Sequence, residues 1–159
     1  MKRTMLLMAS ATLALLVVAG AAIAQDGVRK VCDTNCSGTA GDDHLIGTAN
    51  PNTIWGLEGA DLIQGNAGGD TLYGGLGGDA VYGGNGKDKV YGGRGNDYLD
   101  GGAAEDYIDA GAGNDTIVAK DGFKDQVYCG DGFDQVYVDA IDVLHDCEKE
   151  LTQKPQPQL

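Results

Sequence analysis

A nine-residue phrase, repeated nine times between Gly38 and Val118, constrains the fold of this chain more than any other feature. Its sixth place holds aspartate in eight of the nine copies, and its eighth place holds leucine, isoleucine or valine in all nine. The clearest copies are GGNGKDKVY, beginning at Gly83, and GGRGNDYLD, beginning at Gly92. No α-helix has this period, and a fixed repeat indicates stacked units that cannot bury their apolar sides alone. The sequence therefore predicts an all-β solenoid.

The composition also favours a repeat architecture over an ordinary packed core. The 159 residues include 27 glycines but only one tryptophan, seven tyrosines and two phenylalanines. Aspartate and glutamate number 24 against 11 lysines and arginines. That excess of negative charge disfavours nucleic acid and anionic membranes as partners and favours cations. Many acidic surfaces serve only solubility, but here the acids fall in register.

The first 24 residues have the features of a secretory signal peptide. Lys2 and Arg3 precede an apolar run from Met5 to Val18, and Ala22-Ile23-Ala24 forms a small-x-small cleavage site. We therefore expect cleavage after Ala24 and an extracellular, secreted protein that has no membrane association after cleavage. An uncleaved anchor is the alternative, because the run extended to Ile23 is long enough to cross a bilayer.

The residue types within the repeat predict a cation site. Glycines at the first, fourth and often second places let the backbone adopt positive φ, so that carbonyl oxygens can line a tight loop. The aspartate adds a carboxylate at the end of the same loop. An all-oxygen set of many flexible ligands favours Ca²⁺ over Mg²⁺. Turn chemistry alone would explain one Gly-x-Asp, but eight in register favour several calcium ions.

The copies GGLGGDAVY, GGNGKDKVY, GGRGNDYLD and AGAGNDTIV resemble the calcium-binding nonapeptide repeats of RTX proteins. This resemblance implies a parallel β-roll with two nonapeptides per coil, and calcium bound between successive loops along both edges. The carboxylates expected along one edge are those of Asp43, Asp61, Asp79, Asp97 and Asp115. Those expected along the other edge are Asp70, Asp88 and Asp106, with Asn52 in a ninth, doubtful place. The loop carbonyls expected to assist them include those of Gly75, Gly77, Gly84, Gly86, Gly93 and Gly95.

The regions outside the regular array are expected to close its ends. Residues 25–37 would form an N-terminal cap, 38–118 the roll, 119–150 degenerate repeats with a disulfide-closed cap, and 151–159 a disordered tail. One extra residue after Val118 shifts the register of the repeat. In the shifted register Asp125 and Asp134 still stand two residues before an aliphatic residue, and they are weaker candidate ligands. The segment VDAIDVLHDCE also resembles the ends of small secreted bacterial proteins of this kind.

The four cysteines are expected to form disulfides in an oxidising space. Between Cys36 and Cys129 the array spans roughly four to five coils about 4.8 Å apart, whereas a disulfide limits its two Cα atoms to about 7 Å. We therefore expect Cys32 to pair with Cys36 and Cys129 with Cys147. A zinc site is the rival interpretation, although Cys-x3-Cys has no matching pair nearby.

Aromatic residues and histidine suggest further roles that the sequence leaves open. Trp55, Tyr73 and Tyr91 lie eighteen residues apart and should stack on one outer face, with Tyr82 on the opposite face. They form either a structural ladder of rings or a platform for sugars. His44 is expected to be a solvated surface residue.

The predicted function is calcium binding, with the array folding when it binds Ca²⁺. Each copy buries only one aliphatic side chain, and its stacked carboxylates repel one another. The alternative is an adhesive or envelope-associated module that recognises a polysaccharide or protein partner, with calcium as scaffold. We expect no enzyme and no catalytic residue, because the chain has neither HExxH nor GxSxG and no room for a hydrolase domain.

Overall fold

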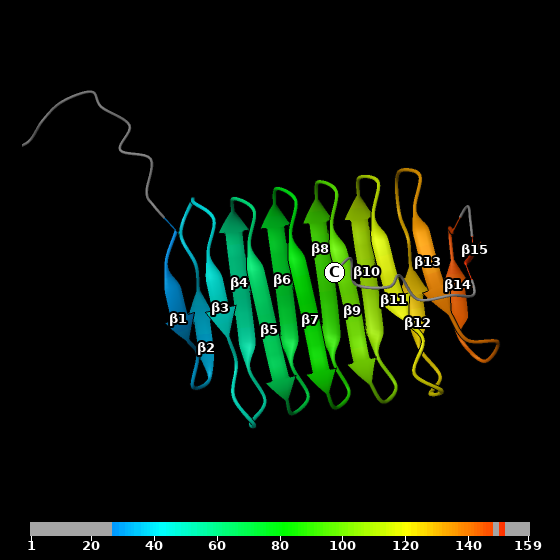
Figure 1. Cartoon of the computed structure of the whole chain (residues 1–159), viewed down its shortest axis with the longest axis horizontal. Helices are drawn as coiled ribbons and strands as arrows, with labels where there is room; N and C mark the ends of the chain where they lie inside the picture. Colours follow the sequence, from blue (N-terminus) through cyan, green and yellow to red (C-terminus); the bar gives the residue numbers. More distant parts are fainter. Residues whose placement is uncertain (1–26, 148–149, 152–159) are drawn as a thin grey trace, which may run out of the picture.

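The structure is a computed structural model that describes residues 27–147 and 150–151. Every regular element in this part of the chain is a β-strand, and the strands wind into a flattened roll (Figure 1). The predicted signal peptide and residues 152–159 of the predicted tail lie outside the described residues, whereas Leu151 belongs to a strand. Within the described ranges, no helix has the length and apolar character needed to span a membrane.

The strands alternate along the chain between two parallel sheets. The eight-stranded sheet holds β1 (Arg29–Val31), β3 (His44–Ile46), β5 (Leu62–Ala67), β7 (Ala80–Asn85), β9 (Tyr98–Ala103), β11 (Thr116–Ala119), β13 (Gln135–Val138) and β15 (Glu150–Leu151). The seven-stranded sheet holds β2 (Asn35–Ser37), β4 (Thr53–Glu58), β6 (Thr71–Leu76), β8 (Lys89–Arg94), β10 (Tyr107–Ala112), β12 (Gln126–Tyr128) and β14 (Val143–His145).

The register of the sheets follows the repeat. Val81 of β7 pairs with Leu99 of β9, and Leu72 of β6 pairs with Val90 of β8, so equivalent places in alternate copies lie side by side. Two nonapeptides therefore make one coil, and the predicted parallel β-roll is confirmed.

The core is a single file of aliphatic side chains between the two sheets. The eighth-place residues of all nine copies, from Leu45 to Ile117, have no exposed surface. Val127 and Val136 extend the same file beyond the regular array. In strands such as β6 and β8 the residues that flank the core position point outward and stay at least partly exposed, as the two-residue period of a strand requires.

A disulfide lies at each end of this core. Cys32 pairs with Cys36 across four residues, and Cys129 pairs with Cys147 across 18 residues, which confirms the expected pairing. The cysteines are therefore not available as zinc ligands.

The outer aromatic residues form a longer ladder than the sequence suggested. Trp55, Tyr73 and Tyr91 stack with ring centroids 5.9 and 4.8 Å apart and planes within 9° of parallel. Tyr107 and Tyr128 continue the row, which ends where Tyr128 stacks on His145 at 4.2 Å. Because the rings of Trp55, Tyr73 and Tyr91 cover one another's faces, the row fits a structural ladder better than a platform for sugars.

Candidate functional site

The loops at the two long edges of the roll place the repeat aspartates in two columns. We call the loops that lead from an even-numbered strand to the next odd-numbered strand the first edge, and the remaining loops the second edge. Asp43, Asp61, Asp79, Asp97 and Asp115 lie along the first edge, and Asn52, Asp70, Asp88 and Asp106 along the second, as expected. Each of these side chains is at most 5% exposed.

One carboxylate oxygen of each interior aspartate is used to hold neighbouring coils together. On the first edge, the backbone N–H of Asp61 donates to Oδ1 of Asp79 at 2.9 Å, and that of Asp79 donates to Oδ1 of Asp97 at 2.8 Å. On the second edge, the N–H of Asp70 donates to Oδ1 of Asp88 at 2.7 Å. The Oδ1 atoms thus have partners within the protein.

The second oxygen of most aspartates has no such partner. Among the described residues, seven buried Oδ2 atoms accept no hydrogen bond, and they belong to Asp61, Asp70, Asp79, Asp88, Asp97, Asp115 and Asp134. A buried polar atom without a partner costs about 1–3 kcal/mol, and more when it is charged. Rows of such atoms therefore indicate that something outside the polypeptide satisfies them.

Backbone carbonyls lie beside these oxygens. A Cβ added to Gly65 would lie 2.5 Å from Oδ2 of Asp70 and 2.5 Å from the carbonyl oxygen of Gly83, one coil further along. The same point at Gly74 is 2.5 Å from Oδ2 of Asp79 and 2.6 Å from the carbonyl oxygen of Gly92. The first-place glycine thus leaves space where a carboxylate oxygen and a carbonyl oxygen of successive coils meet.

This donor set fits a calcium ion better than a transition metal. In the described ranges, no three His, Cys, Asp or Glu side chains converge on one point. A cation at these edges would therefore be held by one or two carboxylates and several carbonyls, which is the hard oxygen set that Ca²⁺ prefers. Carbonyls of Gly75 and Gly77, which were expected to contribute, face Gly93 and Gly95 of the following coil. First-place carbonyls such as those of Gly83 and Gly92 were not anticipated.

The electrostatics of the columns also favour a bound cation. Burial raises the pKa of Asp61, Asp79 and Asp88 to about 6, although a backbone hydrogen bond to each carboxylate opposes the shift. The pKa of Asp106 rises to about 8 because of burial, against the hydrogen bond from Asp88, and the charges of Asp88 and Asp125 raise it further. Without a cation, these four carboxylates are thus held in surroundings that disfavour their charge.

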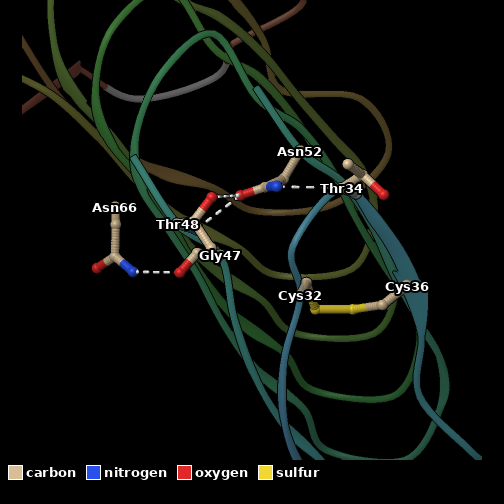
Figure 2. Close-up of a disulfide and its surroundings, with 7 residues drawn as sticks. All are labelled: Cys32, Thr34, Cys36, Gly47, Thr48, Asn52 and Asn66. Atoms are coloured by element: carbon tan, nitrogen blue, oxygen red, sulfur yellow. Dashed lines mark hydrogen bonds between the residues drawn. A yellow bond between two sulfur atoms is a disulfide. The ribbon is translucent and has the colours of Figure 1, made fainter. Parts of the chain in front are cut away.

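The first coil differs from the rest because hydrogen bonds satisfy its side chains. The amide of Asn52 accepts the backbone N–H of Thr48 at 2.7 Å and donates Nδ2–H to the carbonyl of Thr34 at 3.2 Å, next to the Cys32–Cys36 disulfide (Figure 2).

Asp43, on the other edge of this coil, is also fully paired. Its Oδ1 accepts the backbone N–H of Val28, and its Oδ2 accepts the backbone N–H of Thr39. Threonine at the second place of these two copies therefore supplies N–H donors. Asp43 was expected to be a calcium ligand, but in this structure it has no oxygen left without a partner.

The columns continue past the regular array. The backbone N–H of Asp115 donates to Oδ1 of Asp134 at 2.9 Å, and that of Asp106 donates to Oδ1 of Asp125 at 2.8 Å. Asp142 extends the second edge by accepting the N–H of Asp125 at 3.1 Å. The extra residue that shifts the phase after Val118 is absorbed in a loop, so Asp125 and Asp134 keep their places in the columns, and Asp142 holds a further place that was not anticipated from the sequence.

His44 has no place in this oxygen set. Its Nε2 lies 3.1 Å from Oε1 of Gln64 on the outer face of the eight-stranded sheet, and its side chain is partly exposed. This hydrogen bond between neighbouring strands agrees with the expected surface role.

A comparison with protein families identifies the repeat. The model of the RTX calcium-binding nonapeptide repeat matches in four overlapping segments, 37–72, 46–81, 55–90 and 82–117. Together they cover 37–117, which is just over half of the 159 residues. The chain belongs to the RTX calcium-binding nonapeptide repeat family. It is therefore a calcium-binding repeat protein, and the loops described above are its RTX loops. No curated protein matches its sequence significantly.

Proposed function

We propose that this RTX protein is secreted, and that its roll folds when calcium binds between successive loops of both edges. The observation that carries the proposal is the set of seven buried Oδ2 atoms without a hydrogen-bond partner. At about 1–3 kcal/mol each, their combined cost is comparable to the whole stability of a domain of this size, about 5–15 kcal/mol. Cation binding turns this cost into a source of stability, because the free energy of binding becomes free energy of folding.

The proposed ligands are the aspartates whose oxygens lack partners, with the adjacent carbonyls of successive coils. They are Asp61, Asp79, Asp97, Asp115 and Asp134 on the first edge and Asp70 and Asp88 on the second. Asp106 is included on the second edge because its Oδ2 lies 2.7 Å from the Cβ position of Gly101, the first-place glycine of its copy. Asp43 is proposed as a structural residue, because hydrogen bonds already satisfy its carboxylate.

The proposed activity is binding and not turnover. The stacked RTX loops supply oxygen ligands for a cation. His44, which could act as a base, forms a hydrogen bond with Gln64. Secretion is proposed from the charged and apolar pattern of residues 1–24. Extracellular calcium in the millimolar range suits sites of modest affinity.

The test combines far-UV circular dichroism with calorimetric titration of the mature chain. In a chelator the protein should show an unfolded spectrum, and millimolar CaCl₂ should restore the β signal with binding of several ions. Millimolar MgCl₂ serves as the control and should restore little of the signal. An identical β spectrum in chelator and in calcium would contradict calcium-dependent folding.

A further inference from the structure

A cavity on the second edge of the roll has an unusual charge for this protein. It has a volume of about 470 Å³ and lies where β8, β10 and β12 meet their preceding loops. Three lysines line it, namely Lys87, Lys89 and Lys124. The whole chain has only 11 lysines and arginines against 24 acidic residues, so this is a local concentration of positive charge on an acidic molecule.

The lysines occupy defined places in the stack of coils. Lys89 of β8 pairs with Tyr107 of β10, which pairs with Gln126 of β12, so these three side chains form one row on the outer sheet face. Lys87 and Lys124 each directly precede an aspartate of the second-edge column. They form a second row of side chains, with Glu105 of the intervening coil between them.

The neighbouring coils on the same edge lack bases at these places. The residues directly before the column side chain are Pro51, Gly69 and Ile141 there, and those directly after it are Thr53, Thr71 and Val143. Bases directly before or after a column side chain are therefore confined to this site and are not a general property of the edge.

The charges of the site are only partly balanced within the protein. Lys87 Nζ pairs with Glu105 Oε2 at 2.5 Å, and the pKa of Glu105 is lowered by this hydrogen bond, with a smaller contribution from Lys124. Among the described residues, neither Lys89 nor Lys124 forms an ion pair. One glutamate thus faces three lysines.

Below the lysines lie the buried carboxylates of Asp88 and Asp106, which also line the cavity. When they are ionised, these carboxylates offset the charge of the lysines. Calcium at the second edge, as in the proposed function on which this inference rests, would neutralise them and leave the lysines in excess.

We propose that this cavity binds a sulfate or carboxylate group of an extended acidic polysaccharide, with Lys89 and Lys124 as the primary contacts. An extended sugar chain suits an open site whose lysines lie two coils apart, roughly 10 Å along the roll. Tyr107 and Gln126 add hydrogen-bonding groups between the two lysines. Nucleic acid fits less well, because its dense phosphate charge would be repelled by the acidic remainder of the molecule.

The test measures binding of a dextran sulfate oligomer to the calcium-loaded protein by calorimetry, with unsulfated dextran of the same length as the matched probe. Dextran sulfate should bind and unsulfated dextran should not. Lys89→Gln and Lys124→Gln should each weaken binding about two- to fivefold, as expected for exposed charge pairs, and the effect should diminish at high salt. The control is Arg94→Gln, an exposed base on the first edge, which should leave the affinity unchanged.

Equal weakening by Arg94→Gln and by the lysine variants would overturn the site, as would no weakening by any of them. Single-stranded DNA of the same charge that competes equally with dextran sulfate would overturn the assignment to a polysaccharide. Circular dichroism of each protein in calcium separates the two proposals. A folded, calcium-dependent roll that binds no dextran sulfate refutes this inference alone, whereas a roll indifferent to calcium refutes the proposed function.

Discussion

The substitution Asp88→Asn should have opposite effects on the two states of the roll. Asp88 is 2% exposed, its Oδ1 accepts the N–H of Asp70, and its Oδ2 has no partner. An asparagine keeps the first hydrogen bond and replaces the orphaned oxygen with an N–H donor close to the carbonyl oxygen of Gly101. The metal-free roll should therefore gain about 1–3 kcal/mol, the cost of an unsatisfied buried polar group.

The calcium-loaded state should respond in the other direction. Removing one carboxylate lowers the ligand charge that sets calcium affinity, so the variant should need more calcium to fold. We expect the calcium midpoint of the β signal to rise, and the folding midpoint in chelator to move to a lower concentration of trimethylamine N-oxide, an osmolyte that favours compact states. Circular dichroism measures both midpoints on the same samples.

The matched control is Asp131→Asn, which makes the same chemical change at an exposed loop position. It should leave both midpoints within the error of the wild type. If Asp88→Asn destabilised the metal-free roll as much as the calcium-loaded one, the reasoning from orphaned oxygens would be refuted.

Three further predictions concern the first coil, backbone strain and pH. Asn52→Asp, the reverse substitution, removes the hydrogen bond to Thr34 and adds a buried charge. It should therefore destabilise the metal-free roll by about 1–3 kcal/mol, measured in the same osmolyte titration. A stabilised variant would contradict this. Ala104 has φ +109° in a region that costs a non-glycine residue about 1–3 kcal/mol. Ala104→Gly should therefore raise the melting temperature in calcium, whereas Ala103→Gly, at a strand position without positive φ, should lower it; equal shifts would refute the strain. Because the pKa of Asp106 in the folded roll is about 8 against an ordinary value of 3.8, protonation stabilises the metal-free roll at low pH, and this contribution is lost as the pH rises through about 8. Circular dichroism in chelator should show more β structure near pH 4 than near pH 8. Calcium affinity should decrease as the pH is lowered, because protons compete with calcium for the carboxylates. A β signal and a calcium affinity that do not change with pH would contradict both expectations.

The period of the sequence predicted the roll and its columns because each place in the repeat has one structural role. Once two copies make a coil, the eighth-place aliphatics must form the core, and alternate aspartates must share an edge. The spacing of eighteen residues alone predicts that Asp79 lies next to Asp97 in one column and that Asp88 lies next to Asp106 in the other.

What the sequence could not predict depends on how the loops adjust. Asp134 follows Asp115 by 19 residues, because a longer loop takes up the shift and restores the column. Tyr107 extends the aromatic ladder from the seventh place of its copy, where the earlier rings occupy the ninth. The pairing of Asp43 depends on N–H groups of Thr39 and Val28, whose directions the repeat does not specify.

Calcium binding between the loops is tested most directly by a crystal structure of the protein grown with calcium, with the ions located by anomalous scattering. Calcium bound between the loops should give peaks about 2.3–2.6 Å from the orphaned Oδ2 atoms on both edges, with none beside Asn52. Ions bound only to exposed carboxylates, with those Oδ2 atoms still lacking a ligand, would contradict it.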